Sequence, residues 1–165
     1  MNINISNIIT AIPAVSQHPD RDALIIRLLH ETGARVSEVI EFARTGLKGK
    51  NIIVLPVIGT SRHYLRDDKT IRSEKNTSAV KEYRVSHSLY EELRRYISQS
   101  NTQTYVFESN RSKLKHISRW YVWWILGKAS EHAGIRITGK HDIRTGSREK
   151  GIYPHVFRNM KRGKV

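Results

Sequence analysis

Near the C-terminus, the stretch "IYPHVFRNMKRGKV" places a histidine and an arginine, His155 and Arg158, three residues apart. Side chains at positions i and i+3 share one face of a helix, and Pro154 suits the first turn of such a helix. Two basic groups on one helix face are well placed to hold a phosphate. The alternative interpretation is that they belong to an ordinary solvated basic face.

Two other basic positions also suit phosphate chemistry. Arg35, in "TGARVSE", lies at a sharp junction between two predicted helices. It is either a phosphate ligand or a helix-end arginine that caps carbonyls or pairs with Glu38. The segment "SEKNTSAVKEYRVSHSL" supplies a lysine, which is Lys75 as our first choice and Lys81 as the alternative. Lys75 has its own plainer interpretation, a solvated lysine in a polar turn.

The charge of the chain is large and uneven. The 165 residues include 29 Lys and Arg and 15 Asp and Glu, a formal net charge of +14. Residues 111–165 hold 14 Lys and Arg against 3 Asp and Glu, whereas residues 1–110 hold 15 against 12. Such a surface attracts a polyanion, nucleic acid first and an anionic membrane second. We expect the C-terminal third to meet it.

Several functional classes are disfavoured by what the sequence lacks. There is no cysteine, so it predicts no disulfide framework and no thiolate metal site. The eight histidines show no metal-ligand spacing, so we expect no metal and no other cofactor. No apolar run is long enough to span a membrane, and no signal-peptide pattern opens the chain. We therefore predict a soluble, cytoplasmic protein.

The elements that must position the basic residues follow from periodicity and turn residues. Apolar spacing predicts a short helix ended by Pro13 and a strong one ended by Gly33. The run "NIIVLPVIG" predicts a strand, followed by further strands with a hairpin tip at 75–79. Helices return from residue 88 onward. The predicted fold class is α+β, mostly helical, with a small antiparallel sheet.

The segment "SRWYVWWILGKASEHAGI" predicts a long helix, with Ser118 as its cap and Gly134 as its stop. It contains all three tryptophans, Trp120, Trp123 and Trp124. Their flat rings suit base stacking. Residues at i, i+3 and i+4 also form one apolar stripe, and such stripes usually face the core. We therefore predict that at least Trp120 and Trp124 are buried.

Three segments in this order resemble the catalytic domain of the tyrosine recombinases, the phage-integrase and Xer family. "LLHETGARVSEVIEF" resembles the first box of that family, and "KEYRVSHSLYEELRRYI" resembles its third strand and following helix. "HAGIRITGKHDIRTGSREKGIYPHVFR" resembles the second box, and its end is most like the archaeal and archaeal-virus integrases. The resemblance covers essentially the whole chain and implies that family's fold.

The resemblance also implies roles for the basic residues. Arg35 and Arg158 would bind the scissile phosphate, and His155 would contact it and transfer a proton. Lys75, or alternatively Lys81, would protonate the leaving 5′-oxygen. The chemistry agrees, because an in-line displacement at phosphorus builds negative charge that cationic groups stabilise without a metal. Arginine suits this role, since its planar fork binds two phosphate oxygens at once.

The implied partner is double-stranded DNA, with self-association among recombinase subunits on it and no membrane. Contacts with the DNA backbone are expected mainly from the basic residues of the C-terminal third, namely Arg111, Lys113, Lys115, Arg119, Lys140, Arg144, Arg148, Lys150, Lys161 and Arg162. These contacts would not read the base sequence.

The family's nucleophile is a tyrosine beyond the second arginine, and the residues after Arg158 include no tyrosine. Asn159 also replaces the usual histidine there. We therefore expect residues 1–165 to be one catalytic domain without the nucleophile segment and without the preceding core-binding domain. The implied function is site-specific recombination, integration or excision, through a 3′-phosphotyrosyl intermediate. The alternative is an inactive relative that occupies recombination sites or regulates a full-length recombinase.

Overall fold

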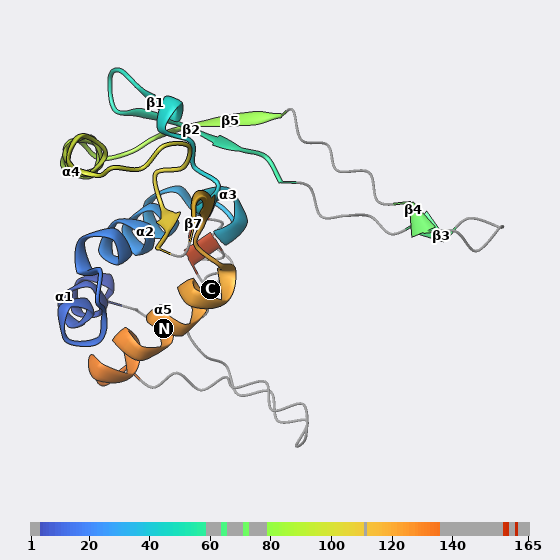
Figure 1. The fold of residues 1–165 in the computed structure, drawn as a ribbon. Coiled ribbons are helices and arrows are strands. Elements are labelled where there is room, and N and C mark those ends of the chain that lie inside the picture. The colour runs from blue at the N-terminus through green and yellow to red at the C-terminus, as the bar shows by residue number, and fades with distance from the viewer. Residues whose placement is uncertain are drawn as a thin grey trace.

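The structure is a computed structural model, which describes residues 4–58, 64–65, 71–72, 79–110, 112–135, 157–158 and 161. Helices come first, then short strands, then helices again (Figure 1). This confirms the predicted fold class, α+β and mostly helical with a small antiparallel sheet. The first elements are α1 (Ile5–Val15), α2 (Pro19–Thr32), α3 (Val36–Ile40), the 3-10 turn η1 (Arg44–Gly46), β1 (Leu47–Lys48) and β2 (Ile52–Pro56). The remaining ones are β3 (Tyr64–Leu65), β4 (Ile71–Arg72), β5 (Val80–Arg84), α4 (His87–Gln99), β6 (Glu108–Ser109), β7 (Ser112–His116) and α5 (Arg119–His132).

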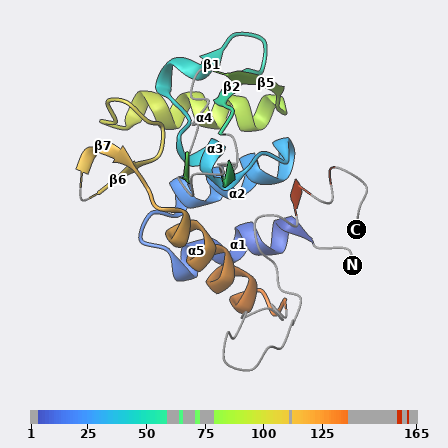
Figure 2. The same cartoon turned by 90° about the vertical axis from the view of Figure 1, so that its right-hand side faces the viewer.

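Helix α2 is the central element of the fold. It packs against α1, α3, α4 and α5. Figure 2 shows α2 and α3 between two layers, with the sheet and α4 on one side and α1 and α5 on the other. A helix in this position is apolar around much of its circumference. The buried apolar residues of α2 are Leu24, Ile25, Ile26, Leu28 and Leu29.

The main sheet has the order β1-β2-β5, and both strand pairs are antiparallel. Ile53 and Leu55 of β2 are fully buried. In the register of the sheet Ile53 lies opposite Tyr83, and Leu55 lies opposite Lys81. Directly opposed residues share one face of a sheet. Tyr83 and Lys81 therefore lie on the same side of the sheet as these two residues, Tyr83 half-buried and Lys81 exposed.

One expected boundary was wrong. Helix α1 does not end at Pro13 but continues to Val15, with Pro13 inside it. A proline removes one N–H bond, and this loss is small so close to the end of the helix. Residues 75–78 of the hairpin tip expected at 75–79 lie outside the described residues. Among the described residues before it, Leu65 of β3 pairs with Ile71 of β4.

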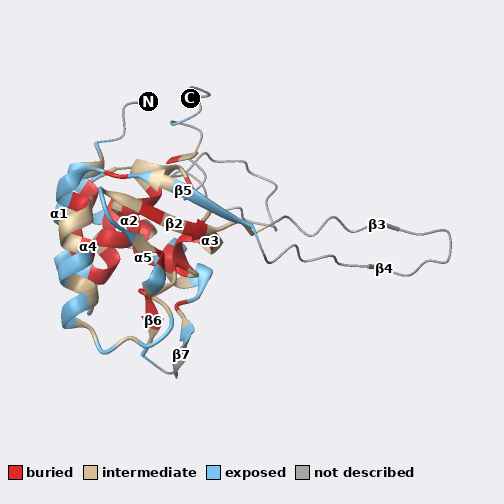
Figure 3. Cartoon of the chain, turned by 90° about the horizontal axis from the view of Figure 1, so that it is seen from above, coloured by how far each residue is buried: buried red, intermediate tan, exposed pale blue. Residues whose placement is uncertain are grey.

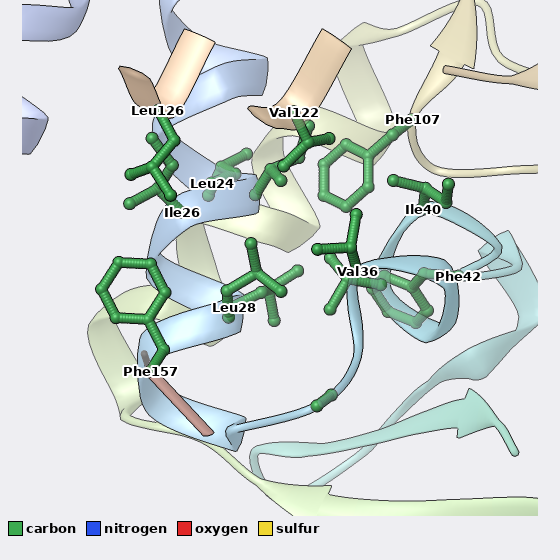
Figure 4. Packing of buried hydrophobic residues seen from close by; sticks show 14 of the residues in the cluster. Leu24, Ile26, Leu28, Val36, Ile40, Phe42, Phe107, Val122, Leu126 and Phe157 are labelled. Carbon is green, nitrogen blue, oxygen red and sulfur yellow. The ribbon is translucent and has the colours of Figure 1, made fainter. Parts of the chain in front are cut away.

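The hydrophobic core lies where α1, α2, α3 and α5 meet. Leu24, Leu28, Val122 and Leu126 converge there, and Phe107 joins them from the segment before β6 (Figure 4). Figure 3 shows buried residues gathered between the helices and exposed ones along their outer sides. Burying one leucine side chain contributes roughly 1.5–3 kcal/mol. The core therefore holds α5 firmly against α2.

Helix α5 confirms one expectation and overturns another. Ser118 caps it as predicted, because its Oγ accepts a hydrogen bond from the Tyr121 N–H at 3.1 Å. Trp120 and Trp124, however, are not buried; their exposed fractions are 72% and 40%. The helix buries Val122, Ile125, Leu126 and Ala129 instead. At about 100° per residue, this stripe points away from the tryptophans. The helix has two apolar faces, and spacing alone did not show which one meets the core.

Candidate functional site: a basic cluster at the end of helix α2

The turn between α2 and α3 positions Arg35. Gly33 ends α2 in the left-handed conformation, with φ +62°, and its N–H donates to the Leu29 carbonyl at 3.0 Å. A β-carbon is disfavoured in this conformation, so glycine suits the position. Thr32 Oγ1 accepts from the Ala34 N–H at 3.1 Å, and Ala34 is buried. The backbone is therefore fixed on both sides of the junction, and Arg35 begins α3 in an extended conformation.

Glu38 and the end of β2 hold the arginine itself. A Glu38 carboxylate oxygen accepts from the Arg35 N–H at 2.7 Å, and the other lies 3.8 Å from Arg35 Nη1. The same Nη1 donates to the carbonyl of Ile58, just beyond β2. The Arg35 side chain is nevertheless 30% exposed. The helix-end pairing with Glu38 is thus present, and it leaves part of the guanidinium accessible to a ligand.

The C-terminal segment brings Arg158 to the same junction. The Arg158 Cα lies 3.6 Å from where a β-carbon on Gly33 would stand, and the Lys161 Cβ lies 3.1 Å from it. Phe157 anchors this contact. It is 1% exposed, lies in the same cluster as Leu28 (Figure 4), and meets the His30 ring edge-on at 5.9 Å between centroids. One buried aromatic residue therefore holds the Arg158 backbone beside Gly33, which lies two residues before Arg35 in the sequence.

The phenol of Tyr83 on β5 lies within the electrostatic influence of both arginines. Burial raises the pKa of its phenol, and Glu38 raises that pKa further, whereas Arg158 and Arg35 both lower it. Both guanidinium groups thus exert their charge on the same hydroxyl. Lys81 Nζ lies 4.8 Å from the centroid of the Tyr83 ring, in cation–π contact. We call Arg35, Lys81 and Arg158 the basic cluster.

The sequence analysis did not select Tyr83 as a site residue, although its spacing from Lys81 was a usable signal. Positions 81 and 83 lie two apart on one strand, so their side chains share a face. A candidate lysine at position 81 therefore implied a neighbour at 83. That the neighbour also lies near Arg35 and Arg158 depends on the packing of β5 beside the α2–α3 turn.

Several predicted residues lie away from the cluster or outside the described chain. Lys115 is exposed on β7, Arg119 is exposed at the start of α5, and Lys161 is exposed beside Gly33. Lys113 lies on β7, and its side chain is not described. The other predicted site residues fall outside the described residues: Lys75, His155, Arg111, Lys140, Arg144, Arg148, Lys150 and Arg162.

A hollow lies at the opposite end of α2 from the basic cluster. It has a volume of about 310 Å³ and includes His18, Arg21, Tyr96 and Glu108 in its lining. Helix α2 has 14 residues, so its two ends are about 21 Å apart. The hollow is therefore separate from the basic cluster.

Buried Asp22 holds Arg21, one of the residues that line the hollow. It is fully buried and accepts hydrogen bonds from Arg21 Nε at 2.9 Å, Ser16 Oγ at 2.5 Å and the Tyr121 hydroxyl at 2.6 Å. A buried carboxylate needs such partners. Because they come from the α1–α2 turn and from α5, we interpret this network as a structural joint.

Two classes of site find no support in the described residues. No group of three or more His, Asp or Glu side chains in the described ranges could hold a metal ion. Among the same residues, no helix is long and apolar enough to cross a membrane.

Comparisons with known proteins support the fold. No family model matches the sequence, and no curated protein matches it significantly. Among solved structures, the fold is similar to that of a XerA recombinase, with a TM-score of 0.61 and 19% sequence identity. The match covers 94% of this chain and 46% of the recombinase chain, so the chain spans less than half of that protein. The likeness shows a distant recombinase-like fold.

Proposed function

We propose that this protein binds duplex DNA and that the basic cluster holds the scissile phosphate of a tyrosine-recombinase reaction. The observation that carries the proposal is that the Arg158 backbone lies against Gly33 in the turn that leads into Arg35, although the two arginines are 123 positions apart in sequence. Two guanidinium groups near one point suit a phosphate that gains charge during displacement. The similarity in fold to a recombinase supports the same interpretation.

Lys81 is a better candidate for the general acid than Lys75, which lies outside the described residues. Its ammonium group contacts Tyr83, whose hydroxyl is in the field of both arginines. Tyr83 and Lys81 also lie on one side of β5, opposite Ile53 and Leu55 of β2. A proton donor must lie within hydrogen-bond reach of the leaving oxygen. We propose that Lys81 is this donor.

The proposed step is a transfer of one phosphoryl group. A tyrosine hydroxyl attacks the phosphorus and loses its proton, His155 being the proposed acceptor. The bond from phosphorus to the 5′-oxygen breaks, and Lys81 gives a proton to that oxygen. The product is a 3′-phosphotyrosyl link and a free 5′-hydroxyl. Arg35 and Arg158 stabilise the charge on the two non-bridging oxygens.

We propose that the nucleophile is a tyrosine outside this chain, supplied by a further segment or by another subunit on the DNA. Tyr83 is unsuited to the role. Burial and Glu38 raise the pKa of its phenol, which disfavours the phenolate. In the cell, this reaction would integrate or excise a mobile or viral element.

The first test is binding to labelled duplex DNA across a salt series. We expect binding that weakens steeply between low and moderate salt, because neutralised phosphates release counterions. Arg35→Ala and Arg158→Ala should each weaken it, whereas Arg94→Ala is the matched control on the exposed side of α4. No binding at low salt, or equal effects of all three substitutions, contradicts the proposal.

The second test separates an active recombinase from an inactive DNA-binding relative. The chain is mixed with a nicked duplex that traps covalent intermediates, alone and with a subunit that supplies a tyrosine helix. The active form predicts a denaturation-resistant adduct only in the mixture. Duplex binding that depends on Arg158 without any adduct in either case would favour the inactive relative.

A further inference from the structure

The three tryptophans of the chain lie together on the outward side of α5. Trp120 is 72% exposed, Trp123 is 45% exposed and Trp124 is 40% exposed. The residues that α5 buries, among them Val122, Ile125 and Leu126, lie on the opposite side. We call Trp120, Trp123, Trp124 and Gly127 the tryptophan face. The fold places this face toward solvent, although tryptophan is on average a well-buried residue.

Gly127 lies on the same side of the helix, three residues after Trp124. A glycine inside a helix costs about 1 kcal/mol relative to alanine. A β-carbon at Gly127 would meet nothing within 4 Å, so no close contact in the described structure requires a glycine there. The missing side chain leaves a flat strip of backbone beside the rings. A ligand that stacks on the tryptophans therefore has room to approach the helix closely.

The charge around the tryptophan face suits an anionic ligand. Lys115 and Arg119 are exposed on the chain leading into this face, and Lys128 is exposed one turn beyond Trp124. The acidic neighbour among the described residues of α5 is Glu131, which lies 3.4 Å from Lys128 at the far end of the helix. The end nearest Trp120 is thus positive. Flat aromatic rings beside cationic side chains are the usual surface for unpaired bases and their phosphates.

The exposed area of the tryptophan face is too small for a stable interface with a second copy of this chain. At about 250 Å² for each tryptophan, the exposed fractions amount to roughly 400 Å². A stable interface needs about 800 Å² per partner. One or a few stacked bases, in contrast, are covered fully by such an area. Duplex DNA does not offer its base faces, because they are stacked on one another.

We infer that the tryptophan face binds unpaired bases of single-stranded DNA, while Arg119 and Lys115 hold the adjoining phosphates. The inference rests on the proposed function in so far as both require DNA. It adds a second class of substrate structure, a melted or extruded strand beside the duplex. Such strands arise wherever duplex DNA is opened or exchanged.

Intrinsic fluorescence tests the inference directly, because every tryptophan of the chain lies on this face. A thymidine oligonucleotide of about 12 nucleotides, within the usual site size, is titrated into the protein. We expect the emission to be quenched, with a saturable binding curve. Trp120→Leu should weaken binding about 10-fold, since each stacked base contributes roughly 1–3 kcal/mol. Trp120→Phe, which keeps a flat ring, should lose less.

The controls distinguish this surface from the basic cluster. Trp120 is mostly exposed, so its substitution should leave the melting temperature unchanged, as circular dichroism would verify. Arg158→Ala should weaken duplex binding but leave the binding of the thymidine oligonucleotide within about twofold. If duplex binding fails while the oligonucleotide still binds, the proposed function is wrong and this inference stands.

Two results would overturn the inference. One is oligonucleotide binding that is equally tight for the wild type, Trp120→Leu and Trp120→Phe. The other is a protein that sediments as a dimer without DNA and becomes monomeric on Trp120→Leu, which would assign the tryptophan face to a second copy.

Discussion

Arg158 lies against Gly33, with its Cα 3.6 Å from the position that a β-carbon on the glycine would occupy. This contact joins the end of α2 to the C-terminal segment. It also links the two boxes of the sequence, because Gly33 belongs to "TGARVSE" and Arg158 to "PHVFR". The spacing between the two candidate phosphate ligands therefore depends on a residue without a side chain.

Gly33→Ala should damage both the fold and the cluster. A left-handed conformation costs a residue with a β-carbon about 1–2 kcal/mol, and the new carbon would stand 3.1 Å from the Lys161 side chain. We expect a lower free energy of unfolding, measured in urea, and duplex binding weakened as much as by Arg158→Ala. Gly49→Ala is the matched control, since nothing lies within 4 Å of a β-carbon there. If Gly33→Ala binds duplex DNA as tightly as the wild type, the placement of Arg158 does not depend on its contact with Gly33.

Lys81→Ala should block proton transfer rather than DNA binding. In the mixture that forms an adduct, we expect cleavage to slow by 100-fold or more, as general acids typically contribute 10²–10⁴. A substrate with sulfur in place of the leaving 5′-oxygen needs no proton, so it should restore the rate for Lys81→Ala but not for Arg158→Ala.

Lys75→Ala, assayed beside Lys81→Ala, decides between the two lysines. If only Lys75→Ala is restored by the sulfur substrate, the assignment of the general acid to Lys81 is wrong.

The pKa of Tyr83 measures whether the two arginines converge in solution. Both lower it, so Arg35→Ala and Arg158→Ala should each raise it, because each removes a positive charge that stabilises the phenolate. Glu38→Gln should lower it. Carbon-13 NMR of labelled tyrosine across a pH series resolves this residue from the others. An unchanged pKa in Arg158→Ala would place that guanidinium away from Tyr83.

His30 should make the C-terminal contact sensitive to acid. Burial lowers its pKa below the ordinary 6.5, Lys161 lowers it further, and Glu31 partly opposes both. The neutral form is therefore favoured in the folded state, and its stabilising effect is present above pH 6.5. As the pH falls through the lowered pKa, the ring gains a charge beside Phe157, and stability is lost.

Urea unfolding at pH 7.5 and at pH 5 checks this expectation. His30→Leu should lose less stability than the wild type between the two pH values. An equal loss in both proteins would assign the acid sensitivity to other groups.

The class of fold was predictable from the sequence because it depends on local patterns. Apolar spacing marked α2 and α5, Gly33 marked the end of α2, and Ser118 marked the start of α5. These features act within a few residues of the chain, through backbone conformation and local hydrogen bonds, so they depend little on how the helices pack together. The placement of Arg35 at a junction between helices follows from the same signals.

The candidate site could be named only in part from the sequence. Arg35 and Arg158 were proposed through resemblance to a family, and their role in binding phosphate remains a prediction. Lys75 was ranked above Lys81 because it fits the place, just before the third strand, that the resemblance implies for the general acid. Which lysine lies near the arginines depends on strand register, and that register puts Lys81 opposite Leu55 and beside Tyr83.

By itself, then, the sequence determined an α+β chain, mostly helical, with its positive charge concentrated toward the C-terminus. The tertiary structure alone decided which side of α5 is buried. Both sides of that helix are apolar, and the free energy of burial does not depend on direction. Packing against α1 and α2 accommodates Val122, Ile125 and Leu126, so the larger tryptophans remain at the surface.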